Sequence, residues 1–187
     1  MGLQMGLGST DFYQDASGTP PRFALLIIPP LAGTCILFFS RKGKQFINDL
    51  DTSQLTILHT IRLPIEIVLY FLFVDKAIPE IMTFEGRNWD ILAGITAPFI
   101  FYFRYIKNSL STKVVILWNV VSIGLLLNII VLAILSAKTP FQRFGFEQPN
   151  IAVAYFPFNW LPSVVVPLVL FSHLASIKKL LTENPKK

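Results

Sequence analysis

Four polar side chains recur at helical spacing inside one long apolar segment, Leu55–Phe73, of this 187-residue sequence. They are His59, Arg62, Glu66 and Tyr70, which on an α-helix fall within a stripe about 80° wide. Ionisable groups within such a segment usually face the interior of a bundle and mark a path for ions or protons. In this interpretation Glu66 gains and loses a proton, Arg62 balances its charge, and His59 links the pair to the cytoplasm. Alternatively, Arg62 and Glu66 neutralise each other and hold neighbouring helices together.

A second histidine, His173, lies near one end of the last apolar segment, at about the predicted depth of His59. Two histidines at one depth on two helices are a common pair of haem ligands. No metal-binding spacing motif accompanies them, so the sequence predicts no cofactor and leaves a haem held by His59 and His173 as the weaker alternative.

Two loops between apolar segments supply further candidate binding residues. These residues are Glu85, Arg87, Asn88 and Asp90 in the first loop, and Arg143 and Glu147 in the second. Because binding residues are often on loops, we expect the two loops to form an outer mouth for a small polar or zwitterionic solute. Alternatively, the first loop is a helix start with Asn88 as the N-cap and Asp90 favouring the helix dipole, which leaves Glu85 and Arg87 unexplained.

The composition is that of a membrane protein. Hydrophobic residues make up 53% of the chain and charged residues only 14%, whereas soluble domains carry about 25% charged residues. The net charge of +5 does not indicate a nucleic-acid partner, because the basic residues lie mainly in short segments between apolar runs. The sequence contains none of the common hydrolase, phosphate-binding or dinucleotide-binding motifs, which argues against an enzyme without excluding one.

The apolar runs predict an all-α bundle of transmembrane helices forming one domain over residues 23–180. A flexible lead-in, 1–22, precedes the bundle, and a basic tail, 181–187, follows it. The five predicted spans lie near residues 23–39, 55–73, 89–105, 114–135 and 151–177. A sixth span is expected if the mildly apolar start of the sequence is the end of a helix in a longer parent chain.

The basic residues predict the orientation of the bundle. The segments 40–54, 104–113 and 178–187 hold ten Lys and Arg residues, whereas 1–22, 74–88 and 136–150 hold five. Since cytoplasmic loops carry the excess of basic residues, the first set is predicted to be cytoplasmic. This places the N-terminus outside and the C-terminus inside a bacterial inner membrane.

The run HTIRLPIEIVLYFLF, followed by MTFEGRNWDILAG, resembles small multi-pass bacterial membrane proteins that have no assigned function. The resemblance covers about residues 20 to 180 and implies a class but no activity. The leading hypothesis is a small transporter-like protein coupled to protons or ions. The alternatives are an accessory subunit that binds another membrane chain or a second copy of itself, and an intramembrane enzyme or haem protein acting on lipid-soluble substrates.

Overall fold

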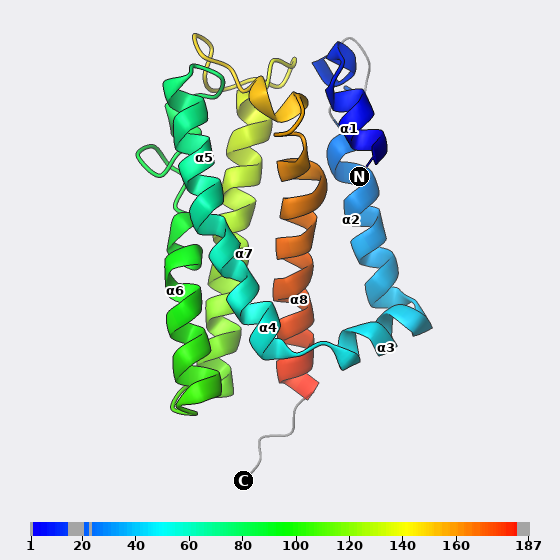
Figure 1. The fold of residues 1–187 in the computed structure, drawn as a ribbon, viewed down its shortest axis with the longest axis vertical. Coiled ribbons are helices and arrows are strands. Elements are labelled where there is room, and N and C mark those ends of the chain that lie inside the picture. The colour runs from blue at the N-terminus through cyan, green and yellow to red at the C-terminus, as the bar shows by residue number, and fades with distance from the viewer. Residues whose placement is uncertain (1, 15–20, 23, 183–187) are drawn as a thin grey trace.

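Upright helices standing side by side dominate the fold (Figure 1). A computed structural model describes residues 2–14, 21–22 and 24–182, and these are all-helical apart from loops and one isolated β-bridge between Ala137 and Asn150. The α-helices are α1 (Gly2–Gly8), α2 (Ala24–Phe39), α3 (Arg41–Asp49), α4 (Thr52–Leu58), α5 (Arg62–Val74), α6 (Ile91–Phe101), α7 (Thr112–Ser136) and α8 (Val166–Thr182). Short 3-10 turns are η1 (Asp11–Gln14), η2 (His59–Ile61), η3 (Glu80–Met82) and η5 (Ala152–Ala154), and π-turns are η4 (Tyr102–Ile106) and η6 (Leu161–Val165).

Among the residues that the structure describes, three continuous helical runs are long and apolar enough to cross a bilayer: Thr52–Val74, Thr112–Ser136 and Leu161–Thr182. A fourth is present only if α2 and α3 count as one span, although the two are bent by 86°. The run Ile91–Ile106 is apolar but shorter, and covers about 24 Å against a hydrocarbon thickness of about 30 Å. The five predicted spans are therefore corrected to three or four, because the first is bent at its end and the third begins late.

The bend after α2 has a local cause. Ser40 caps α3, its hydroxyl accepting a hydrogen bond from the Gly43 backbone N–H over 3.0 Å. A Cβ on Gly43 would lie 2.0 Å from the Leu37 carbonyl oxygen, so only glycine allows the two helices to approach this closely. The basic helix α3 buries Ile47 and exposes Arg41, as a helix lying along a membrane surface does.

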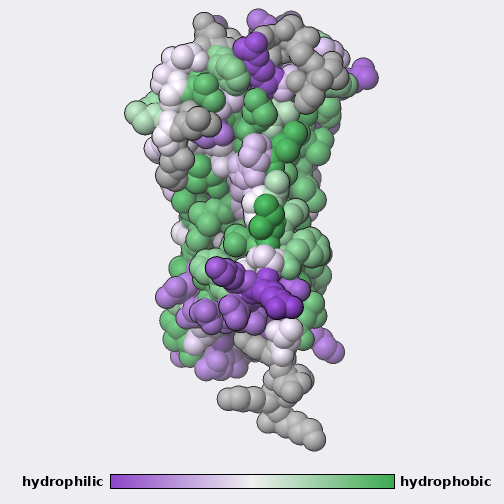
Figure 2. All heavy atoms as spheres, turned by 90° about the vertical axis from the view of Figure 1, so that its right-hand side faces the viewer, coloured by the Kyte–Doolittle hydropathy of each residue, from purple (hydrophilic) through white to green (hydrophobic). Residues whose placement is uncertain are grey.

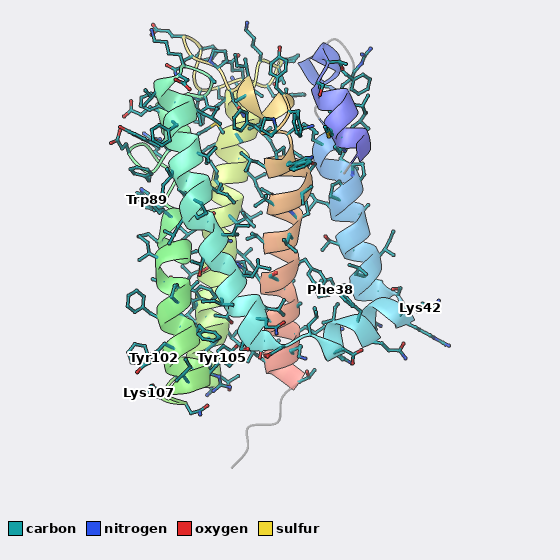
Figure 3. The ribbon with its side chains drawn as sticks, viewed as in Figure 1. Phe38, Lys42, Trp89, Tyr102, Tyr105 and Lys107 are labelled. Atoms are coloured by element: carbon teal, nitrogen blue, oxygen red, sulfur yellow. The ribbon has the colours of Figure 1, made fainter. Side chains whose placement is uncertain are left out.

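The polar segments separate to the two ends of the bundle. The helix α3, the turn after α6 and the end of α8 share the lower end in Figure 1, and α1 and the loop 137–150 share the upper end. Figure 2 shows a mainly hydrophobic middle band between these hydrophilic ends. Tyr102, Tyr105 and Lys107 lie at the lower end of α6 (Figure 3). The three segments predicted to share the cytoplasmic side thus lie together, and which side they face remains a prediction.

The start of the chain differs from a flexible lead-in where it is described. Helices α1 and η1 pack on the bundle, with Tyr13 only 2% exposed and the Phe156 N–H donating to the Gly8 carbonyl over 2.8 Å. Residues 15–20 and the tail beyond 182 lie outside the described residues.

A single 3-10 turn interrupts the helix that carries the polar residues. The turn η2 joins α4 to α5 just before Pro64. Pro64 has no N–H to donate to the carbonyl of Thr60, so the helix lacks one of its regular hydrogen bonds at this point. The turn includes His59 and leads directly into Arg62, and it therefore sets how these two side chains enter the bundle.

Candidate functional site

Arg62 is the centre of a buried polar cluster. Its side chain is 2% exposed, and Nη1 donates to Oδ1 of Asp90 over 2.7 Å. Asp90 stands immediately before α6, so this ion pair joins two helices. The sequence suggested Glu66, one turn along the same helix, as the partner of Arg62. Within the described residues Arg62 instead forms its ion pair with Asp90.

The hydrogen bonds around His173 assign its tautomer. Its Nδ1 lies 2.7 Å from Oδ1 of Asn119, and the Asn119 amide donates to the Val115 carbonyl over 2.8 Å, which orients Oδ1 as the acceptor. Nδ1 therefore carries the hydrogen, and Nε2 accepts from Nη2 of Arg62 over 2.9 Å. A neutral imidazole satisfies both contacts, so His173 adds no charge to the cluster.

Asn119→Leu is expected to destabilise the protein by about 1–3 kcal/mol, because it leaves the buried Nδ1–H of His173 without an acceptor. Thermal unfolding in detergent, followed by circular dichroism, measures the change. Asn128→Leu is the matched control, since Asn128 lies on the exposed face of the same helix and donates to the Arg87 carbonyl. A loss at Asn119 no larger than the loss at Asn128 would show that the His173 contact has no special weight.

His59 stacks on His173 rather than facing it across a shared ligand. The ring centroids are 3.7 Å apart with an interplanar angle of 9°, and the Trp118 ring packs edge-on against both. A haem would need one nitrogen of each ring to point at a common iron, and stacked rings do not provide this. In the described part of the chain, no group of three or more His, Cys, Asp or Glu residues is placed to hold a metal.

Asn88 holds Glu66 in place. Its Nδ2 lies 2.7 Å from both carboxylate oxygens of Glu66, and its Oδ1 accepts from the Asp90 N–H over 3.1 Å. Asn88 is fully buried and Glu66 is 2% exposed. The predicted N-cap at Asn88 is corrected, because Asp90 occupies the cap position and Asn88 reaches into the bundle.

Two close backbone approaches position the loop and α6. A Cβ on Gly86 would lie 2.2 Å from the Glu80 carbonyl oxygen, so the loop can fold back tightly only with glycine there. A Cβ on Gly94 would lie 3.1 Å from the Leu63 nitrogen, which shows how closely α6 packs on α5. Figure 3 shows Trp89, which lies just before α6, well below the upper end of α5. This geometry brings Asn88 and Asp90 to the level of the charged cluster.

The remaining predicted site residues lie elsewhere. Tyr70 is half-buried and stacks on Phe84 with a centroid distance of 5.3 Å, so it does not join the cluster. Four residues of the predicted outer mouth are exposed, and no contact between them is found among the described residues: Glu85, Arg87, Arg143 and Glu147. The two loops do meet, but through Gln148, whose amide donates to the carbonyls of Phe73 and Ile78.

An apolar cavity of about 90 Å³ lies on the upper side of the cluster. Its walls are aliphatic and come from α2, α5, α7, α8 and η6, and its polar lining consists of Arg62, Glu66 and Asp90. In Figure 1, the segments of α7 and α8 that line it are those nearer α1 and the loop 137–150.

Several of the buried polar atoms that have no protein partner lie on the lower side of the cluster. They include both ring nitrogens of His59, and the hydroxyls of Thr60 and Ser176. Ser176 lies one helical turn beyond His173 on α8, which packs against α4. Buried polar atoms are usually hydrogen-bonded to protein or ordered water, so this side suits water more than hydrocarbon.

Sequence reasoning missed the partners of Arg62 and His173. At a spacing of three residues, Asn119 and Ser122 share a face of the predicted span 114–135, and this pattern indicates hydrogen bonds to another helix without identifying that helix. Asn119 and Ser122 are buried, and the Ser122 carbonyl lies 3.5 Å from Nη1 of Arg62. The shared face was thus the only signal for this part of the cluster.

Comparison with known proteins gives a family but no activity. Residues 23–181 match the family described as a domain of unknown function, DUF8737, and the chain belongs to that family. No curated protein and no solved structure shows a significant match to the chain.

Proposed function

We propose that this member of the DUF8737 family is a small proton-coupled membrane protein of the transporter type, in which Glu66 takes up and releases the proton. The observation that carries the proposal is the charge of the buried cluster. Arg62 is paired with Asp90, whereas Glu66 accepts hydrogen bonds from the neutral amide of Asn88. With both carboxyl groups ionised the cluster has one negative charge in excess, and an unbalanced charge inside a bilayer is costly. A proton on Glu66 removes it.

The donor set favours a proton over a metal ion at Glu66. Hard metal cations take about six or more oxygen ligands. Around Glu66 the neighbouring polar groups are one amide, one carboxylate and one guanidinium, and the rest of the cavity wall is aliphatic. A proton needs only the carboxylate itself.

The two sides of the cluster offer two routes to Glu66. The aliphatic cavity connects Glu66 toward the upper end of the bundle. On the lower side, the buried polar atoms of His59 and Ser176 that have no protein partner mark the second route. Arg62 lies between His59 and Glu66 along the helix, and a guanidinium does not give up its proton. We therefore modify the relay inferred from the sequence: a proton that moves between His59 and Glu66 passes through water beside Arg62.

In this proposal the bundle crosses a bacterial inner membrane, with the end that carries α3 in the cytoplasm. The support is the distribution of basic residues along the sequence, because the segments predicted to be cytoplasmic hold ten Lys and Arg residues and the other three segments hold five. The accessory-subunit and enzyme alternatives gain no specific support from the described residues.

Proteoliposomes test the proposal. We expect an imposed potassium diffusion potential to drive proton uptake into vesicles containing the protein, as reported by an internal pH dye, and we expect Glu66→Gln to reduce it to the level of protein-free vesicles. Glu85→Gln is the matched control, because Glu85 is exposed and outside the cluster. Unchanged uptake in Glu66→Gln would contradict the proposal, as would a wild-type protein that moves no protons.

A further inference from the structure

The cavity beside Glu66 has the size and walls of a site for a short hydrocarbon chain. Its volume is about 90 Å³, and side chains such as Ile27, Leu69, Ile130 and Val169 form its walls. An apolar cavity of about 150 Å³ holds benzene, so this one suits a chain of about four carbons. The aliphatic walls exclude a strongly polar solute from all but the end near the charged cluster.

The polar end of the cavity selects the charge of its occupant. Arg62 and Asp90 already hold each other at 2.7 Å, and Glu66 has one neutral donor, Asn88, for its two oxygens. A carboxylate can accept about four hydrogen bonds, so Glu66 keeps acceptor capacity for another donor. When Glu66 and Asp90 are both ionised, the cluster has one negative charge in excess. An anion would increase this charge and a neutral molecule would not change it, whereas a cation neutralises it.

We infer that this cavity binds a small aliphatic amine in its ammonium form, with the ammonium at Glu66 and the alkyl chain along the aliphatic walls. The ammonium supplies three N–H donors, which match the oxygens of Glu66 and Asp90. The inference rests on the proposed function and names the solute class of the same site. Since a proton and an ammonium compete for one carboxylate, binding of the amine displaces the proton from Glu66.

Thermal unfolding of the full-length protein in detergent tests the site, with n-butylammonium chloride as the probe. A ligand that binds only the folded protein raises the melting temperature, and the rise grows with the ligand concentration relative to its Kd. We expect a rise with n-butylammonium that exceeds any rise with n-butanol or sodium butyrate at equal concentration and ionic strength. An equal rise with butanol would show a purely apolar site, such as one for a lipid chain, and a larger rise with butyrate would show that Arg62 selects the ligand; either would overturn the inference.

Variants separate the head-group site from the chain site. We expect Glu66→Gln to lose the rise with n-butylammonium, and Glu85→Gln to keep it. Ala133→Leu narrows the cavity without touching any charge, and we expect it to lose the rise as well, which keeps the test decisive if Glu66→Gln folds poorly. A full rise in either Glu66→Gln or Ala133→Leu would overturn the site.

The two proposals can fail separately. Proton uptake that depends on Glu66, without selective binding of n-butylammonium, would remove the amine and leave the proposed function. Selective binding that needs Glu66, in a protein that moves no protons, would remove the proposed function and leave the amine site. Binding in detergent is the cleaner readout, because the uncharged form of an alkylamine crosses lipid by itself.

Discussion

Asp90→Leu is expected to lower the free energy of unfolding by about 3–5 kcal/mol, because it leaves a buried guanidinium without its counter-ion. Arg62 is 2% exposed and its Nη1 lies 2.7 Å from Asp90 Oδ1, so water cannot easily replace the lost partner. Chemical unfolding in mixed micelles, with circular dichroism as the signal, measures the change. Arg87→Leu is the control, since Arg87 is exposed and its loss should cost no more than about 0.5 kcal/mol.

The double variant Arg62→Leu with Asp90→Leu distinguishes a pair from two independent residues. Replacing both members of a buried ion pair by apolar groups is often neutral or stabilising, so we expect the double variant to recover most of the loss seen in Asp90→Leu. The same cycle with Glu66 in place of Asp90 should show a smaller coupling energy, because Glu66 is not the ion-pair partner of Arg62. A stronger coupling to Glu66 would contradict the arrangement of the cluster.

Burial of the charged residues was predictable from the sequence. His59, Arg62 and Glu66 share one stripe in a segment that otherwise reads as lipid-facing, and all three are buried, at 0%, 2% and 2% exposure. The cost of an ion in hydrocarbon forces this outcome whatever the rest of the fold does. Burial is not forced on Tyr70, because an uncharged aromatic ring can lie against lipid at little cost. Tyr70 stacks on Phe84 instead of joining the cluster.

The partners of these residues were not predictable. Asn88 and Asp90 follow a polar loop, and spacing alone places them at the membrane surface. Their depth depends on contacts between segments distant in sequence, above all where Gly94 packs on Leu63. A single sequence gives no measure of such an approach, so Asp90 was assigned to an outer mouth rather than to Arg62.

The start of the last span was placed too early for a related reason. A hydropathy average identifies a run of apolar residues, but it does not show whether all of them belong to one continuous helix. Residues 151–160 are apolar but form the short turn η5 and a loop before the helix of the last span begins at Leu161. Pro157 and Pro162 break the regular backbone hydrogen bonding there, and the apolar run is therefore longer than the helix.

The central claim is that Glu66 holds a proton in the resting protein. A protonated carboxyl group has a carbonyl stretching band that a carboxylate lacks, and infrared spectroscopy detects it in membrane proteins reconstituted in lipid. Glu66→Gln removes this carboxyl group and keeps the side-chain shape and the position beside Asn88. Glu85→Gln removes an exposed acid and corrects for the loss of one carboxyl group from the chain.

The infrared spectrum near neutral pH is therefore the most direct test. We predict a protonated-carboxyl band in the wild type and in Glu85→Gln, and its loss in Glu66→Gln. A band that survives in Glu66→Gln and disappears in Asp90→Asn would place the proton on the partner of Arg62 instead. A wild-type spectrum without the band would contradict the account, because the excess charge of the cluster would then be balanced by something other than a proton.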